Sequence, residues 1–289
     1  MDGPVIWKEE QLAADLRDLG LPVGSSVLAH TSLRAIGAIE NGAEGLVRVF
    51  REVLGPEGTL LVPTFTGDMR DPMERPAAPE SVEALERARA AVPVFDAETT
   101  PSDVRNMSVF TEQVRRQSDA LRSDHPTHSF AAVGANAAFL TQHAPFHYPL
   151  GSESPLARLH QRDGWVLLLG VGQEVNASLH LAEVWANVPY IHRSARVKTG
   201  VQEWATMQGS PECSAGFRKI EPILRQARLL RRGYVGNAPS QLIKQRELVS
   251  MGVAILQGRG ASLLCEDPAC RWCTVARKYT AGTHPLLTE

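Results

Sequence analysis

The sequence has no long apolar run and no excess of charge of either sign. Its 289 residues carry 30 lysines and arginines against 32 aspartates and glutamates, a formal net charge of -2. A basic excess that would predict nucleic-acid binding is missing, and so is an acidic tail for a cationic macromolecule. No stretch reaches the ~20 apolar residues of a membrane-spanning helix. Because residues 1–12 also lack the apolar core of a signal peptide, we expect a cytoplasmic protein with neither nucleic acid nor membrane as a partner.

Cysteine is scarce, with four in the chain. Cys213 stands alone, whereas Cys265, Cys270 and Cys273 cluster near the C-terminus, and in a reducing cytoplasm such a cluster is more typical of metal binding than of disulfides. The Cys270–Cys273 spacing lets two thiolates chelate one ion, and the other two cysteines would complete a tetrahedral site typical of structural zinc. Such a site would clamp the Cys-rich segment, residues 262–278, to the region near Cys213. Free thiols remain the alternative, because the spacing is not a double Cys-x-x-Cys.

Amphipathic segments alternate with short apolar runs, which predicts one mixed α/β domain over residues 1–289. The expected helices are residues 7–19, 42–54, 81–91, 105–117, 155–161 and 217–232. The expected strands are residues 26–29, 59–62, 165–169 and 196–201. Residues 67–103 shift to proline, alanine and acidic side chains, so we expect a long excursion or lid there, with a solvated loop as the alternative.

The stretch from 165 to 190 carries the best candidate for chemistry. A continuous apolar run, then glycines, then Asn176 or Ser178 as an N-cap, predicts a buried strand that turns into a helix. His180 and Glu183 lie three residues apart and share one helix face. A histidine in the first turn faces the positive helix terminus, which disfavours the imidazolium form and keeps the ring a neutral base.

Two other interpretations of this stretch stay open. Gly170-Val171-Gly172 begins a dinucleotide-binding fingerprint, although Val175 stands where its third glycine belongs. His180 is alternatively a hydrogen-bonded histidine at a helix start with no chemical role.

Two further strands end in polar turns. The first ends in Thr31, Ser32, Leu33 and Arg34, and the second ends at Thr64. Ligands bind outside the carboxyl ends of strands in an open α/β sheet, and amides there, with Arg34, suit a pyrophosphate or a thioester carbonyl. Simple chain reversal is the alternative at both turns.

Several motifs, in matching order over residues 7–278, make the sequence resemble the antibiotic N-acetyltransferase family, the aminoglycoside 3-N-acetyltransferases. The motifs are Ala29-His30-Thr31-Ser32-Leu33-Arg34, Gly55-Pro56-Glu57-Gly58-Thr59-Leu60-Leu61-Val62-Pro63-Thr64, Arg122-Ser123-Asp124-His125-Pro126-Thr127-His128-Ser129-Phe130, Ser154-Pro155-Leu156, Gly170-Val171-Gly172 and Asn176-Ala177-Ser178-Leu179-His180-Leu181-Ala182-Glu183. The resemblance implies a three-layer α/β/α sandwich around a mixed sheet. It also implies acetyl-CoA-dependent acetylation of the 3-amino group of 2-deoxystreptamine aminoglycosides, which confers antibiotic resistance.

The resemblance also implies roles for single residues. His180 falls on the catalytic histidine of the family and Glu183 on its acidic partner, while Ser32, Leu33, Arg34 and Thr64, with Thr31 beside them, lie near the pantetheine and phosphates of CoA. His180 would take the amine proton during attack on the thioester, oriented by a carboxylate. Because no Gly-x-Ser-x-Gly elbow exists, we expect direct transfer without an acyl-enzyme.

An aminoglycoside is polycationic, so its cleft should be acidic. The candidate contributors are Asp68, Glu153, Asp163 and Glu212. Two other functions stay open: acetylation of a different amine in biosynthesis, and non-catalytic binding of an aminoglycoside or CoA. We expect a monomer or a homodimer that acts on small molecules.

Overall fold

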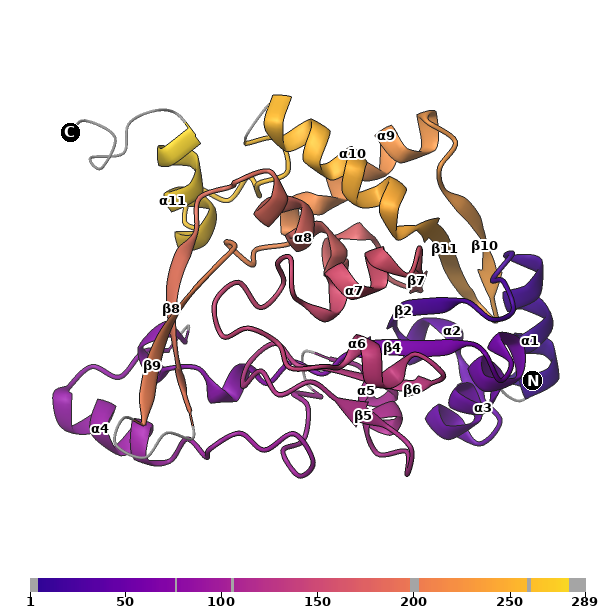
Figure 1. The fold of residues 1–289 in the computed structure, drawn as a ribbon, viewed down its shortest axis with the longest axis horizontal. Coiled ribbons are helices and arrows are strands. Elements are labelled where there is room, and N and C mark those ends of the chain that lie inside the picture. The colour runs from indigo at the N-terminus through magenta and orange to yellow at the C-terminus, as the bar shows by residue number, and fades with distance from the viewer. Residues whose placement is uncertain (1–4, 76, 105–106, 198–202, 259–260, 281–289) are drawn as a thin grey trace.

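The computed structural model describes residues 5–75, 77–104, 107–197, 203–258 and 261–280. A seven-stranded sheet, in the order β10-β11-β7-β2-β4-β6-β5, lies at the centre of the fold (Figure 1). Its strands are β2 (Ser26–Thr31), β4 (Thr59–Pro63), β5 (Leu121–Arg122), β6 (Phe130–Gly134), β7 (Trp165–Leu169), β10 (Arg231–Val235) and β11 (Ala238–Lys244). The three middle strands β7, β2 and β4 run parallel, and the flanking pairs are antiparallel, so the sheet is mixed.

The side chains of the middle strands alternate between two separate apolar cores. In β7, Leu167 and Leu169 belong to one core, whereas Val166 and Leu168 belong to the other. All five residues of this strand are buried, because helices cover both faces of a parallel sheet. The predicted three-layer α/β/α sandwich is therefore confirmed.

Each face of the sheet has its own set of helices. The first core is closed by α1 (Glu9–Asp18), α3 (Gly42–Leu54) and α5 (Val109–Arg115), with α2 (Leu33–Ile36) at its edge. The second is closed by α6 (Ala137–Leu140), α7 (Pro155–Gln161), α8 (Ser178–Trp185), α9 (Glu221–Gln226) and α10 (Gln245–Gly258). Two short strands, β1 (Ile6–Trp7) and β3 (Ala38–Ile39), pair beside the first set.

Local signals set the helix ends that the sequence predicted well. Helix α3 matches the predicted range because its apolar stripe is buried and Gly55, at a φ of 66°, ends it by donating its amide to the carbonyl of Arg51. Helix α7 also matches, since the hydroxyl of Ser154 accepts the Ala157 amide and Pro155 occupies the first helical position. Helix α4 (Val82–Ala90) begins after Ser81, which caps it in the same way.

The region after residue 190 differs from the prediction. A hairpin of β8 (Ile191–Arg196) and β9 (Trp204–Gly209) extends from α8 toward α4 (Figure 1), and residues 198–201 of the predicted strand lie outside the described residues. The segment predicted as one helix over 217–232 is a 3-10 helix (Ala215–Ile220), then α9, then edge strand β10. Helix α11 (Arg271–Thr280) closes the described chain.

The excursion over residues 67–103 holds two 3-10 helices (Gly67–Met69 and Pro72–Glu74) and α4. It is fastened to the hairpin rather than left in solvent. Arg70 forms an isolated antiparallel bridge with Ala195, the Asp71 amide donates to the carbonyl of Ser194, and Arg89 pairs with the Asp71 carboxylate at 2.5 Å. Within the part of the chain that the structure describes, no helix combines the length and apolar character needed to cross a membrane.

Candidate active site and metal centre

His180 and Glu183 form a buried pair on α8. His180 Nδ1 lies 2.6 Å from Glu183 Oε2, and the Glu183 side chain has no solvent exposure. A carboxylate only accepts hydrogen bonds, so Nδ1 of the ring is the donor and Nε2 takes no part in the pair. The three-residue spacing on one helix face therefore brings together a histidine and a carboxylate that orients its ring.

Buried amide side chains hold the start of α8. Asn176 Oδ1 accepts the Ser178 amide at 3.1 Å, so Asn176 caps the first turn even though the cap position itself falls on Ala177. Asn176 Nδ2 in turn donates to Gln173 Oε1 at 2.8 Å. These bonds set the position of His180, one turn further along.

A cavity of about 560 Å³ opens in front of His180, at the carboxyl ends of the parallel strands β2 and β4. Ligands bind at this edge in open α/β sheets. The lining residues come from β2 and α2, from the end of β4, from the excursion, from the starts of α5 and α8, and from loops that connect these and other elements. They are Ala29, His30, Thr31, Ser32, Leu33, Arg34, Pro63, Phe65, Arg70, Val104, Met107, Ser108, Val109, Thr111, His128, Leu150, Val171, Val175, Ala177, His180, Glu212 and Ser214.

Four of the five candidate CoA residues line this cavity, namely Thr31, Ser32, Leu33 and Arg34. The Thr31 hydroxyl is buried and finds no hydrogen-bond partner among the described residues, which is unusual for a buried polar group. The Ser32 amide donates to the carbonyl of Leu169, and the Ser32 hydroxyl accepts the Ala35 amide, so the backbone of this turn is held in place.

Thr64, the fifth candidate, does not line the cavity, and we withdraw it as a CoA contact. Its hydroxyl accepts from Arg122 Nε at 3.1 Å and bonds Ser129 Oγ at 3.0 Å, and its carbonyl accepts from both side chains. Arg122 also donates to the carbonyl of Thr100 at the end of the excursion. The polar groups of Thr64 are therefore used in joining the excursion to β4, and its neighbours Pro63 and Phe65 face the cavity instead.

Of the four candidate acidic residues, only Glu212 lines the cavity. Asp163 lies at the amino end of β7, where Lys244 pairs with it at 2.5 Å, so it is at the opposite edge of the sheet. Asp68 and Glu153 are exposed and lie outside the lining. We therefore keep Glu212 and drop Asp68, Glu153 and Asp163 from this site.

Glu212 is the centre of a buried ionic cluster. Its carboxylate lies 2.9 Å from each of Arg70 Nη2, Arg193 Nη2 and His128 Nε2. Burial alone would raise the pKa of this carboxyl, but the three partners together hold it well below its usual range. Burial lowers the pKa of Arg193 to about 10, which leaves it charged near neutral pH. Glu212 is thus an ionised carboxylate that the protein itself already neutralises.

Three polar residues of the cavity wall, His30, Arg70 and His128, were not among the predicted site residues. His30 and His128 lie in motifs that carry the family resemblance, but no local pattern indicated that they line a cavity. Burial lowers the pKa of His30 to about 4, and its Nε2 accepts the Ala177 amide at 3.4 Å, next to the start of α8. Arg70 lies in the excursion, and only long-range pairing with β8 brings it to the site.

The glycines after β7 do not form a phosphate loop. Gly170 has a φ of 65°, and a Cβ there would lie 2.3 Å from the Cβ of Ala35 in α2. Gly170 is therefore needed for close packing of α2 against the end of β7. This role, together with the missing third glycine, removes the dinucleotide interpretation.

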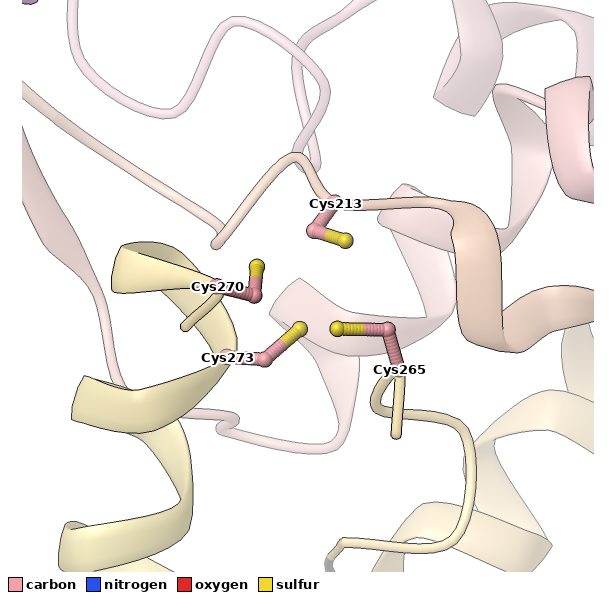
Figure 2. A group of neighbouring side chains, drawn as sticks. All are labelled: Cys213, Cys265, Cys270 and Cys273. Atoms are coloured by element: carbon pink, nitrogen blue, oxygen red, sulfur yellow. The ribbon is translucent and has the colours of Figure 1, made fainter. Parts of the chain in front are cut away.

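The four cysteines converge as the spacing predicted. Figure 2 shows their sulfur atoms turned toward a common centre, from Cys270 and Cys273 at α11 and from Cys213 and Cys265 on two loops. All four sulfurs lie within 4.8 Å of one another, and none is in a disulfide. Tetrahedral zinc with bonds of about 2.3 Å needs sulfurs about 3.8 Å apart, so this donor set fits the ion.

The family model for aminoglycoside 3-N-acetyltransferases matches residues 28–257. Aminoglycoside N(3)-acetyltransferase VII from Streptomyces paromomycinus is 35% identical over 273 residues, which cover 89% of this chain and 93% of that protein. Among solved structures, a histidine-to-alanine mutant of AAC(3)-IVa in complex with a gentamicin superposes with a TM-score of 0.81 at 30% identity, covering 96% of this chain and 99% of that one.

AAC-IIIb, solved as a binary complex with CoASH, superposes with a TM-score of 0.76 at 29% identity, covering 88% of this chain and 98% of that one. Such relatives share both the whole length and the fold. On the family match and this likeness, the chain belongs to the aminoglycoside 3-N-acetyltransferase family of acyltransferases.

Proposed function

We propose that this protein transfers the acetyl group of acetyl-CoA to the 3-amino group of a 2-deoxystreptamine aminoglycoside. The observation that carries the proposal is the His180–Glu183 pair at the wall of the cavity. The relatives bound to gentamicin and to CoASH support the two substrate classes. A cytoplasmic location fits the supply of acetyl-CoA and the four unoxidised thiols.

In the proposed reaction the neutral amine attacks the thioester carbonyl carbon while His180 Nε2 removes its proton. The new C–N bond forms, the C–S bond breaks, and the proton passes on to the CoA thiolate, so amide and CoA are the products. General-base catalysis of this kind is typically worth about 10²–10⁴-fold in rate. The buried Glu183 carboxylate stabilises the imidazolium that forms in between.

The turn from Thr31 to Arg34 is the proposed contact for CoA. The unpartnered Thr31 hydroxyl is a donor for a pantetheine amide or the thioester oxygen, and Arg34 supplies positive charge for phosphates. Thr31 and Arg34 lie at the same edge of the sheet as His180. A CoA bound there would place its thioester next to the proposed base.

We also propose that Cys213, Cys265, Cys270 and Cys273 hold one structural zinc ion. Zinc would supply four thiolate bonds that fasten α11 and its loop to the segment that carries Glu212. A four-thiolate site leaves no open position, so the ion takes no part in acetyl transfer.

One observation favours a second candidate, acetylation of a less cationic amine. Glu212 is the only carboxylate among the described residues that line the cavity, and two arginines already pair with it. A polycation gains little from a carboxylate that is already neutralised.

A panel of aminoglycosides and simple amines, assayed by release of the CoA thiol, tests both candidates. We expect turnover of at least one aminoglycoside, with a loss of about 10²–10⁴-fold in kcat for His180→Ala and unchanged CoA affinity by calorimetry. Glu183→Gln should also lower kcat. This variant should fold normally, because glutamine has nearly the same side-chain volume as glutamate. Turnover of simple amines alone would support the second candidate. Full activity of the His180→Ala variant would exclude His180 as the base.

A further inference from the structure

We propose that Arg70 is a specificity-determining residue that occupies, beside Glu212, the place of an acceptor ammonium group. An acceptor that uses Glu212 must displace the Arg70 guanidinium, so Arg70 raises the KM for polycationic acceptors. The inference rests on the proposed acetyl transfer to an amine in this cavity.

The three partners of Glu212 differ in burial. The side chains of His128 and Arg193 are each 1% exposed, whereas Arg70 is 26% exposed and lines the cavity. Arg193 also lies over the indole of Trp272 at 3.9 Å and donates to the carbonyl of Pro211. Two partners therefore hold Glu212 rigidly from behind, and the third lies on the side that a ligand approaches.

The Arg70 side chain is held by little besides Glu212. Because the Glu212 carboxylate only accepts, His128 must donate to it from Nε2, with Nδ1 accepting from the Thr127 hydroxyl at 2.8 Å. Arg70 Nη2 and His128 Nε2, 3.5 Å apart, are then two donors and form no hydrogen bond. Arg70 Nε is buried and finds no partner among the described residues.

The backbone of Arg70 is fixed, so only its side chain has to move. Its bridge to Ala195 and the adjoining bond from the Asp71 amide to Ser194 tie this part of the excursion to β8. Rotation of the guanidinium away from Glu212 would leave the main chain in place and open the carboxylate to the cavity.

The charges around Glu212 predict the direction in which the KM for a cationic acceptor changes when Arg70 is removed. Glu212 and Arg193 form one pair, and Glu74, 4.0 Å from Arg193, is the second carboxylate of the cluster. Arg70 is the second arginine beside Glu212, and burial lowers the pKa of His128, which favours its neutral form. Without Arg70 one positive charge fewer lies beside Glu212, so the carboxylate attracts an ammonium group more strongly.

The test compares Arg70→Gln and Arg70→Lys with Arg87→Gln, a matched charge removal at an exposed position of the same excursion. KM and kcat are measured for gentamicin and for a monoamine acceptor at two salt concentrations, with thermal unfolding of each variant. We expect Arg70→Gln to lower the gentamicin KM about tenfold, with kcat within twofold and a steeper salt dependence. Arg70→Lys and Arg87→Gln should resemble the wild type.

An unchanged or raised KM in a stably folded Arg70→Gln variant would overturn the proposal, and a raised value would instead mark Arg70 as a contact for an anionic group. If Arg70→Gln unfolds, Arg70→Met serves the same comparison. Combining Arg70→Gln with Glu212→Gln should abolish the gain, because the freed carboxylate is gone.

Failure of the proposed function can be told apart from failure of this inference. If the wild type acetylates no aminoglycoside, the affinity of the wild type and of Arg70→Gln for spermidine, measured by calorimetry, still tests whether Arg70 competes with an ammonium group. Tighter binding to Arg70→Gln than to the wild type would support the role of Arg70 alone, and equal binding would refute it.

Discussion

Two buried histidines of this protein differ in their hydrogen-bond partners. His180 Nδ1 faces the Glu183 carboxylate. His125 faces no carboxylate in its hydrogen bonds: its Nδ1 accepts the amides of Thr127 and His128 and lies 3.4 Å from the Thr127 hydroxyl, and its Nε2 donates to the carbonyl of Phe146. The first arrangement suits a base and the second a neutral structural ring.

The pH dependence of the free energy of unfolding should report on His125. Burial, with His128 nearby, lowers the pKa of His125 from 6.5 to about 3. Between these values the unfolded chain binds more protons than the folded one, so stability is complete above pH 6.5 and is lost as the pH falls toward 3. The slope should be about 1.4 kcal/mol per pH unit for this residue.

Urea unfolding at pH 5 and pH 7.5 measures that slope. Asparagine at position 125 keeps an acceptor for the two amides but does not titrate, so His125→Asn should reduce the slope, while His30, whose pKa burial also lowers, keeps its own contribution. The exposed His192→Asn serves as the control and should leave the slope intact. An equal slope in all three proteins would refute the assignment to His125.

At the scale of elements, the site depends on how α2 packs against the end of β7. Gly170 permits that contact, because its φ is 65° and a Cβ at this position would lie only 2.3 Å from the Cβ of Ala35. Helix α2 carries Leu33 and Arg34, two of the candidate CoA residues. The close approach of α2 to Gly170 therefore helps to position the residues of the proposed CoA site.

Gly170→Ala should therefore lower both stability and CoA affinity. We expect a loss of about 1–3 kcal/mol from backbone strain alone, with a rise of several-fold in the Kd for CoA as α2 shifts. Thermal unfolding and calorimetry with CoA give the two values.

Gly172→Ala is the matched control for this prediction. A Cβ at Gly172 would meet only the flexible side chain of Glu174, and Gly172 has an ordinary negative φ of -103°. It should have little effect on either value. Equal effects of the two substitutions would show that packing against Ala35 is not the cause.

At the scale of the whole molecule, the thiol cluster brings the C-terminal segment next to the wall of the cavity. Cys213 directly follows Glu212, which adopts a left-handed backbone at a φ of 58°. Trp272, beside Cys273, stacks on Arg193, which pairs with Glu212. The cluster and the cavity therefore share a short stretch of rigid structure.

Removal of the proposed zinc should weaken this connection. Elemental analysis should find about one zinc per chain, and chelation under reducing conditions should lower the unfolding temperature and change the tryptophan fluorescence. Cys273→Ser should reproduce both changes without chelator. A metal-free sample with the same unfolding temperature and fluorescence would disprove the metal site.

Prediction from the sequence succeeded where the signal was local. Helices α3 and α7 carry an amphipathic stripe and end signals within their own residues, and β7 is a continuous apolar run. It failed for β10, whose Arg231 and Arg232 were included in a basic helix. Charged residues are typical of an exposed edge strand, and only pairing with β11 makes that segment a strand.

The sequence by itself determined the family resemblance, the α/β class, the His180–Glu183 pair and the four convergent cysteines. These features rest on spacing within short segments or on a distinctive residue type. Only the tertiary structure decided which carboxylate reaches the cavity, that Thr64 is used in packing, and that Arg70 from the excursion pairs with Glu212. Those contacts join residues more than 50 positions apart, and no local pattern of charge or hydrophobicity specifies which distant partners meet when the chain packs.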